Sequence, residues 1–420
     1  MSYVLFLIYL AVFSWLLTKS RFVLNSGISA KIIIALFVLK VITGCVHAWI
    51  MMQFANMPDT MVFHAEGLIE YRLLFSHPKE YISNFFRSNY RSGYGSLLSS
   101  TNSYWNDLTS NLIIKFLSIC NIFSFGYYKV NVIFYNFVIF FGAIGLYRVF
   151  NMVYKSSQYL LIITCFLLPS VLFYSSTIHK EGLIFAAIGI AVFNIYTALH
   201  ITGFTLKRII YIILALAFIF FERNYVLLAF LPAAFAWILC ERKKLPALFT
   251  FIIIYIAGVI LFFNAGQLSP SLNLPEAVSK KQWDFMHLPP ASTAIQLNTL
   301  SPSFKSYATN VLQALNHSLL RPYLSDYTLS PFLLPLSVEL FFYELLLLIF
   351  IFFRKKMIVK NSFILFGLFF SISILLIIGY TIPIIGAIVR YRSIYFTFIL
   401  TPIVCSINWG KLQSVLQIKK

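Results

Sequence analysis

The chain has 420 residues, of which 60% are hydrophobic and only 11% are charged, and its mean hydropathy is +0.85. These values exclude an ordinary soluble domain and indicate a protein that crosses a membrane many times. The formal net charge of +19 is spread over short clusters between apolar runs, which argues against a nucleic-acid partner.

We expect an all-α polytopic membrane protein, because the apolar runs approach the roughly 20 residues of a helical span and strand-like alternation is absent. Taken in chain order, about eleven spans are predicted. They cover residues 2–18, 32–53, 128–147, 157–176, 182–200, 209–221, 225–240, 246–264, 333–353, 361–380 and 393–409.

Lys and Arg clusters recur at alternate connections, and this pattern predicts the orientation of the spans. The clusters all become cytoplasmic if the N-terminus lies outside. They stand at 19–31, 148–155, 207–208, 242–244, 354–360 and 411–420. An odd number of spans then places Lys419 and Lys420 in the cytoplasm. We therefore expect a multi-pass protein of a bacterial inner (plasma) membrane.

Two long segments without a span, 54–127 and 265–330, fall on the predicted outer face, and both exceed an ordinary connection. The first is expected to form helices in the plane of the interface. In the second, helical spacing after Phe304 predicts a helix that stops at Arg321, before Pro322. The chain is thereby divided in three parts. These are an N-terminal membrane bundle 1–264 that includes the outer loop 54–127, an extracytoplasmic segment 265–332, and C-terminal membrane helices 333–420.

The first candidate site begins at Asp59, directly after the second predicted span. A carboxylate held just outside the bilayer can act as a general base on a hydroxyl. The alternative is that Asp59 only caps the helix that starts there. His64 and Glu66 follow on the same predicted helix and are candidate substrate-binding residues.

Lys180 and Glu181 stand in a short link between two spans, at the predicted outer boundary. A lysine at such a junction suits a lipid phosphate, and the alternative is a hairpin turn whose charges reach the headgroups. Glu222 and Arg223 occupy a similar junction, where a structural turn or a local ion pair is the favoured interpretation.

The strongest candidate lies between the last two predicted spans, where Arg390 and Arg392 flank Tyr391. The planar fork of arginine suits phosphate oxygens, and tyrosine favours the level of the headgroups. Headgroup anchoring is the alternative. Arg321 is a weaker candidate for the same anion. No cofactor is required by the sequence, and a divalent metal held by Asp59 and another outer carboxylate stays open.

Asp59, the 169–182 segment with Lys180 and Glu181, and the 386–392 segment together resemble the C-type family of polytopic membrane glycosyltransferases. The resemblance is to distant bacterial members and covers most of the chain loosely. It implies that the donor is a sugar on a polyprenyl phosphate or pyrophosphate and that the anomeric carbon is inverted. The implied partners are this donor, a glycan or lipid acceptor, and membrane lipids.

The resemblance further implies that Asp59 is the catalytic acidic residue of the first outer loop. It would remove a proton from the acceptor hydroxyl, while Arg390 and Arg392 stabilise the departing phosphate and Lys180 and Arg321 help to hold it. This mechanism requires these residues to converge in one extracytoplasmic cavity.

Two alternative functions stay open. A polysaccharide repeat-unit polymerase also combines many spans with outer arginines, and its chemistry depends on arginines more than on an acid. A lipid or solute transporter without chemistry is the third candidate. Long asymmetric outer segments and the lack of paired interrupted spans argue against a transporter.

Overall fold

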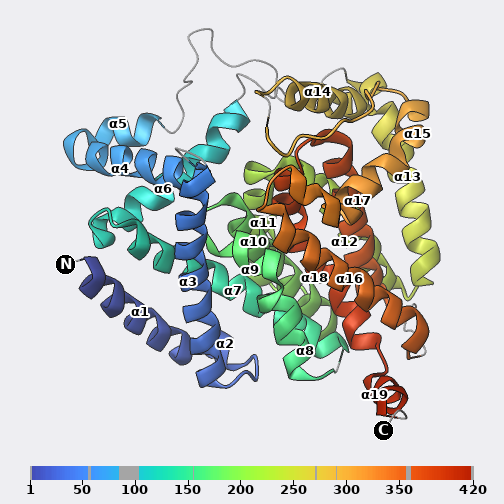
Figure 1. The fold of residues 1–420 in the computed structure, drawn as a ribbon, viewed down its shortest axis with the longest axis horizontal. Coiled ribbons are helices and arrows are strands. Elements are labelled where there is room, and N and C mark those ends of the chain that lie inside the picture. Colours follow the sequence, from blue (N-terminus) through green and yellow to red (C-terminus); the bar gives the residue numbers. More distant parts are fainter. Residues whose placement is uncertain are drawn as a thin grey trace. The chain divides into compact units, whose positions relative to one another are not determined.

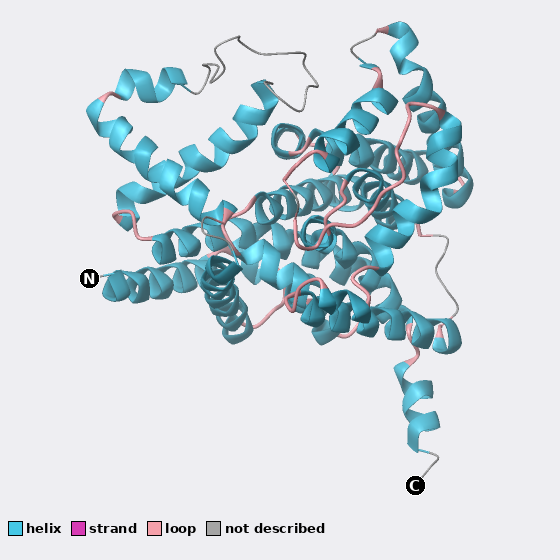
Figure 2. Cartoon of the chain, turned by 45° about the horizontal axis from the view of Figure 1, so that its top comes forward, coloured by secondary structure: helices cyan, strands magenta, loops and turns pink. Residues whose placement is uncertain are grey.

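The computed structural model describes residues 2–54, 58–84, 104–154, 156–269, 272–289, 291–355 and 361–417. Within these ranges the chain is mostly helical and contains no β-strand (Figures 1 and 2), so the predicted all-α class is confirmed. Several of the basic residues used to predict orientation lie outside the described ranges. They are Lys155, the cluster at 356–360, and Lys419 and Lys420.

Nine of the described helices are long and apolar enough to cross a membrane. They are α1 (Ser2–Lys19), α3 (Ala30–Phe54), α7 (Tyr128–Tyr154), α10 (Lys180–Thr197) with its continuation η3 (Ala198–Thr202), α12 (Asn224–Lys243), α13 (Ala247–Leu268), α16 (Leu333–Phe353), α17 (Ser362–Thr381) and α18 (Ile385–Ser406). This supports a multi-pass membrane protein.

The predicted number of eleven spans is not confirmed. A tenth span results if α8 (Gln158–Ile162), η2 (Ile163–Leu167) and α9 (Pro169–Ser176), which are bent by 48°, cross together. The remaining predicted span, 209–221, falls on α11 (Leu206–Glu222), which has 17 residues. This helix is one residue shorter than α1, the shortest of the nine helices.

The segments predicted to carry no span also contain helices. They are α4 (Asp59–Ser76), α5 (Pro78–Ser83), α6 (Tyr104–Ser124), α14 (Leu274–Met286), α15 (Phe304–Leu315), η5 (Asn316–Leu320) and η6 (Leu324–Thr328). The helix predicted after Phe304 is confirmed, because α15 and η5 run on to Leu320 and Arg321 is extended before Pro322. Two further short helices are α2 (Arg21–Leu24) and α19 (Trp409–Gln417).

The chain divides into two compact units. The first unit contains Met1–Val149 and Val171–Asn224, and the second contains Phe150–Ser170 and Tyr225–Lys420. This division describes internal packing, whereas the three predicted parts describe exposure to the membrane and stay a prediction.

Small residues and one buried lysine hold the spans of the first unit together. A Cβ atom added to Gly189 of α10 would lie 2.1 Å from the Gly142 carbonyl oxygen of α7, so these helices approach at backbone distance. Lys40 of α3 is buried and donates to the hydroxyls of Ser175 (2.9 Å) and Ser176 (3.1 Å) of α9. The hydroxyls compensate part of the cost of a charge inside the bundle.

A second lysine joins the three helices before α7. Lys115 of α6 donates to Glu70 of α4 (2.5 Å), to the Tyr81 carbonyl oxygen of α5 (2.6 Å) and to Asn84 (2.7 Å). Figure 1 shows α4, α5 and α6 lying together in blue and cyan. Their positions are therefore fixed by one polar centre, and the start of α4 carries the site described next.

The core of the second unit is aromatic. Phe366 and Phe370 of α17 contact Phe398 of α18 and Phe230 of α12, with ring centroids 5.4–6.1 Å apart. Tyr380, near the end of α17, accepts a 2.8 Å hydrogen bond at its carbonyl oxygen from Gln282 of α14, so the helices between α13 and α16 are tied to the spans.

Candidate functional site

Titratable side chains from three junctions of the first unit gather at the start of α10. We call them the junction cluster: Asp59, His179, Lys180, Glu181, Glu222 and Arg223. Asp59 opens α4, the next three residues stand at the start of α10, and the last two stand between α11 and α12. Because α10 packs against α11, residues far apart in the sequence meet here.

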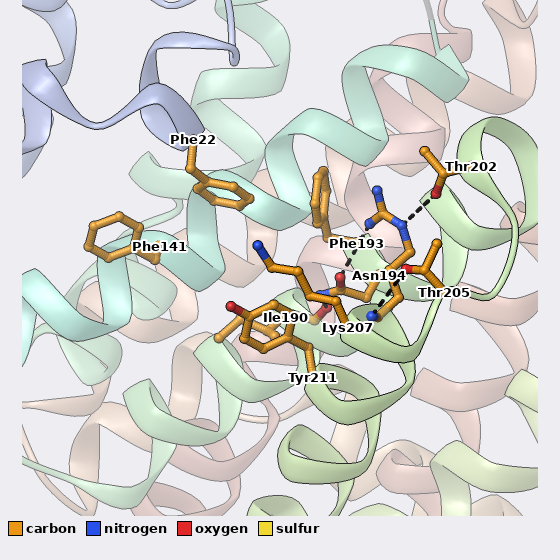
Figure 3. Close-up of a pocket in the computed structure, with 10 residues that line it drawn as sticks. Phe22, Phe141, Ile190, Phe193, Asn194, Thr202, Thr205, Lys207 and Tyr211 are labelled. Carbon is orange, nitrogen blue, oxygen red and sulfur yellow. Dashed lines mark hydrogen bonds between the residues drawn. The ribbon is translucent and has the colours of Figure 1, made fainter.

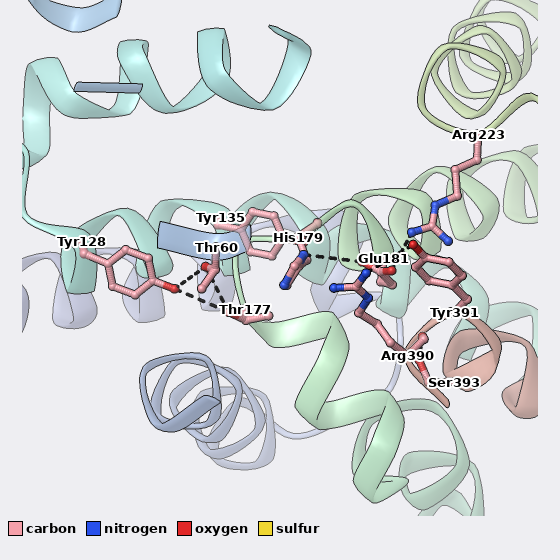
Figure 4. A network of polar contacts seen from close by, with 10 residues as sticks. All are labelled: Thr60, Tyr128, Tyr135, Thr177, His179, Glu181, Arg223, Arg390, Tyr391 and Ser393. Carbon is pink, nitrogen blue, oxygen red and sulfur yellow. Dashed lines mark hydrogen bonds and ion pairs between the residues drawn. The ribbon is translucent and has the colours of Figure 1, made fainter. Parts of the chain in front are cut away.

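A neighbouring residue fixes the position of Asp59. Thr60 is buried, and its hydroxyl lies 2.6 Å from the Tyr128 hydroxyl of α7 and 3.4 Å from that of Thr177, which follows α9 (Figure 4). The first turn of α4 is thereby anchored on two other segments. The Asp59 side chain is exposed, and its charge lies within electrostatic range of Lys180.

The alternative in which Asp59 caps α4 is wrong. The N-cap residue is Pro58, which forms no side-chain cap bond, and Asp59 is the first helical residue. A carboxylate in the first turn still interacts favourably with the positive end of the helix dipole. The structure therefore leaves the Asp59 carboxylate exposed and within electrostatic range of Lys180.

Glu181 forms the buried ion pair of the junction cluster. Its side chain is 2% exposed, and one oxygen accepts a 2.6 Å hydrogen bond from Arg223, while the other lies 3.9 Å from His179 Nδ1 (Figure 4). Gly182 follows because a Cβ atom there would lie 2.4 Å from the Ser175 carbonyl oxygen and 2.4 Å from the Tyr135 hydroxyl. Only glycine lets the start of α10 pack this closely.

Glu222 is buried in the same cluster. Among the described residues, neither oxygen of its carboxylate has a hydrogen-bond partner, and its charge interacts with Lys180 and Arg223. A buried carboxylate that is balanced only by nearby charges is more typical of functional sites than of structural turns. The sequence pattern favoured a structural turn or a local ion pair here, because it does not reveal that the end of α11 meets the start of α10.

His64 and Glu66, the other candidates of the first outer loop, lie on α4. His64 is half-buried, with Nδ1 3.4 Å from Asn131 Nδ2 and its ring 5.3 Å from that of Tyr128. Burial lowers the pKa of His64 below its ordinary value, and the Gly126 backbone opposes this with a smaller effect. The Glu66 side chain is exposed. Their roles in substrate binding stay predictions.

Arg390, Tyr391 and Arg392 belong to the second unit, and their predicted place in a loop between two spans is wrong. The three residues lie inside α18, which begins at Ile385. The helix can include them because their polar groups find partners. Arg390 stacks over Tyr391 at 5.0 Å and donates to its hydroxyl at 3.2 Å (Figure 4).

Arg392 and Arg321 both border η5. Arg392 is 2% exposed and donates a 2.6 Å hydrogen bond to the Ser318 carbonyl oxygen of this turn. Arg321 follows η5 directly and lies 3.9 Å from Asp326, which also accepts a 2.8 Å hydrogen bond from the Tyr323 backbone. Their grouping with Asp59 and Lys180, which belong to the first unit, stays a prediction.

In the part of the chain that the structure describes, no group of three or more His, Cys, Asp or Glu residues could hold a metal ion. The optional divalent ion at Asp59 stays a prediction. No protein-family model, no curated protein and no solved structure matches this chain.

Proposed function

We propose that this chain is a membrane glycosyltransferase that moves a sugar from a polyprenyl phosphate or pyrophosphate to an acceptor hydroxyl, in cell-surface glycan synthesis. One observation carries the proposal: the exposed Asp59 carboxylate lies within electrostatic range of Lys180, at the ends of membrane-length helices. Glycosyl transfer with inversion needs a base for the acceptor and a cation for the leaving phosphate, and these two residues supply them.

The reaction is a single displacement. The Asp59 carboxylate accepts the proton of the acceptor hydroxyl as that oxygen attacks the anomeric carbon. The bond between this carbon and the phosphate oxygen breaks, and its electron pair leaves with the lipid phosphate. The base and the leaving group stand on opposite faces of the sugar, so the anomeric configuration is inverted.

Lys180 stabilises the negative charge that develops on the departing phosphate. It is the first residue of α10, where backbone N–H groups and the helix dipole add further positive potential. The carboxylates of Glu222 and Glu181 lie within electrostatic range of its ammonium group and favour its charged form. Arg321, Arg390, Tyr391 and Arg392 belong to the second unit, and their contact with the leaving phosphate stays a prediction.

An exposed base favours a transferase over the two alternative functions. A polymerase that relies on arginines has no need of Asp59, and a transporter needs no base at all. A neutral residue at this position therefore separates the transferase from both alternatives, and consumption of the lipid donor separates the polymerase from the transporter.

The test incubates the purified full-length protein in detergent with a panel of polyprenyl-linked sugars and short glycan acceptors, and follows loss of the lipid donor. Asp59→Asn should lower the rate about 10²-fold or more, because the general base is lost. Glu80→Gln is the matched control, since Glu80 is an exposed acid on α5, and it should keep the wild-type rate. An Asp59→Asn protein with the wild-type rate would favour the polymerase, and a wild-type protein that consumes no donor would contradict both enzymes.

A further inference from the structure

A cavity in the first unit lies at the opposite end of the span that carries Lys180. It has a volume of about 560 Å³ (Figure 3). Its walls come from α2, α7, α10, η3 and α11, and are formed by Phe22, Phe141, Ile190, Phe193, Asn194, Thr202, Thr205, Lys207, Arg208 and Tyr211. The span from Lys180 to Thr202 has 23 residues. The lining on α10 begins at Ile190, ten residues or about 15 Å from Lys180, so the cavity is distinct from the junction cluster.

Three cations gather at this cavity, and we call them the basic rim: Arg148, Lys207 and Arg208. Lys207 and Arg208 line it directly. The Arg148 guanidinium lies 5.0 Å from the ring of Phe22 and 4.6 Å from that of Phe193, and it is within electrostatic range of Arg208. None of the described residues that line the cavity is acidic. Like charges around a cavity without a carboxylate match an anion.

The structure holds Arg208 in place before any ligand arrives. Its Nε donates to the Thr202 hydroxyl at 2.6 Å, and one terminal nitrogen donates to Asn194 at 3.3 Å (Figure 3). Thr205 caps α11 by accepting from the Arg208 backbone N–H. A guanidinium that is already oriented loses little entropy on binding, and its planar fork matches phosphate oxygens.

Part of the cavity lining is apolar and adjoins the basic rim, and we call it the aromatic wall: Phe22, Phe141 and Phe193. The ring of Phe22 lies 5.1 Å from that of Phe193 and 6.2 Å from that of Phe141. Further along α11, Ile213 and Leu214 are 58% and 61% exposed. In a membrane such an apolar face contacts hydrocarbon, so the acyl chains of lipids are present next to the cavity.

We propose that this cavity binds an anionic phospholipid, with the headgroup phosphate at the basic rim and the upper part of an acyl chain along the aromatic wall. The volume falls in the range of small-molecule sites, about 300–1,000 Å³. A soluble phosphate would contact the basic rim alone and leave the aromatic wall in water. A phospholipid contacts the basic rim with its phosphate and the aromatic wall with its acyl chain.

Native mass spectrometry of the full-length protein in a neutral detergent tests the proposal. The probes are phosphatidylglycerol, phosphatidylcholine with the same acyl chains, and glycerol phosphate without chains. We expect phosphatidylglycerol to bind about tenfold or more tightly than either other probe, because only it combines net negative charge with acyl chains. Lys207→Gln combined with Arg208→Gln should remove this preference.

The matched control combines Lys243→Gln with Lys244→Gln, which removes the same charge from exposed positions at the end of α12. It should bind phosphatidylglycerol as the wild-type protein does. Equal loss in both double variants would show only general attraction of anionic lipid and would overturn the site. Equal binding of glycerol phosphate by the wild-type protein would overturn the lipid assignment. Equal affinity of the wild-type protein for both phospholipids would also overturn the proposal, even if a variant does not fold.

Discussion

Arg223 donates a 2.6 Å hydrogen bond to the Glu181 carboxylate, so the junction between α11 and α12 is tied to the start of α10. The two side chains are 10% and 2% exposed. Forming a buried pair contributes little net stability, because both charges lose their hydration. Breaking such a pair is costly, since one charge then stays buried without its compensation.

Arg223→Met should therefore lower the free energy of unfolding by about 3–5 kcal/mol. Thermal unfolding in detergent measures this as a lower midpoint. Adding Glu181→Gln to Arg223→Met removes both charges and should recover most of the loss. Lys243→Met, at an exposed position on α12, is the matched control and should melt as the wild-type protein does. If Arg223→Met has the same melting temperature as Lys243→Met, the ion pair does not stabilise the junction.

His64 should make the stability of the protein depend on pH. Burial lowers its pKa below the ordinary 6.5, so the unfolded chain binds more protons than the folded chain just below that pH. The contribution of His64 to stability is therefore full above pH 6.5 and is lost as pH falls through the folded-state pKa. His64→Gln should reduce the fall of the melting temperature between pH 6.5 and the acid limit of the measurement.

His77→Gln is the control for this measurement, because His77 is exposed at the C-cap of α4. It should keep the wild-type dependence on pH. If His64→Gln and His77→Gln show the same slope as the wild-type protein, other groups determine the acid sensitivity.

The sequence predicted the helices well and their ends poorly. Each predicted apolar run falls on a helix, because run length and hydropathy are local properties. The run 157–176 is broken before Pro169 with a bend of 48°, which its hydropathy does not show. Arg390 and Arg392 were predicted to lie between two spans, whereas they lie inside α18. Arg392 can be buried inside α18 because it donates a hydrogen bond to the Ser318 carbonyl oxygen. Ser318 lies far from Arg392 in the sequence.

The candidate site was predicted in part for the same reason. Asp59 and Lys180 were recognised from their place at the ends of apolar runs, and the structure brings them within electrostatic range. The sequence predicts only a structural turn or a local ion pair at Glu222, because the proximity of Glu222 to Lys180 depends on how α10 packs against α11. Contacts between distant segments are tertiary information that the periodicity of one sequence does not contain.

Because α7 and α10 approach closely, adding one methyl group between them should lower the stability of the protein. Gly189→Ala would place a Cβ atom 2.1 Å from the Gly142 carbonyl oxygen, so the helices must separate. We expect a loss of about 1–3 kcal/mol in thermal unfolding, as for other overpacked cores. Gly258→Ala on α13 is the matched control, since no atom lies within 4 Å of the added Cβ. Alanine should stabilise that helix by about 0.5–1 kcal/mol. A Gly189→Ala protein at least as stable as the wild type would contradict the close packing.

Variants of Arg390 and Arg392 should differ in their effects, since Arg392 is expected to contribute mainly to stability and Arg390 mainly to phosphate binding. Arg392→Gln removes a charged donor from the buried Ser318 carbonyl oxygen and should lower the free energy of unfolding by about 1.5–3 kcal/mol. Arg390 is only half-buried, so Arg390→Gln should lower the melting temperature less than Arg392→Gln does. If Arg390 contacts the leaving phosphate, the same variant should still consume the lipid donor more slowly.

Lys411→Gln is the control for both arginine variants, because Lys411 is exposed on α19. It should change neither stability nor donor consumption. An Arg390→Gln protein with the wild-type rate would remove Arg390 from the mechanism and leave Lys180 as the cation that stabilises the leaving group. A slow Arg392→Gln protein that has also lost stability would say nothing specific about phosphate. The rate of Arg390→Gln therefore decides whether the second unit takes part in the reaction.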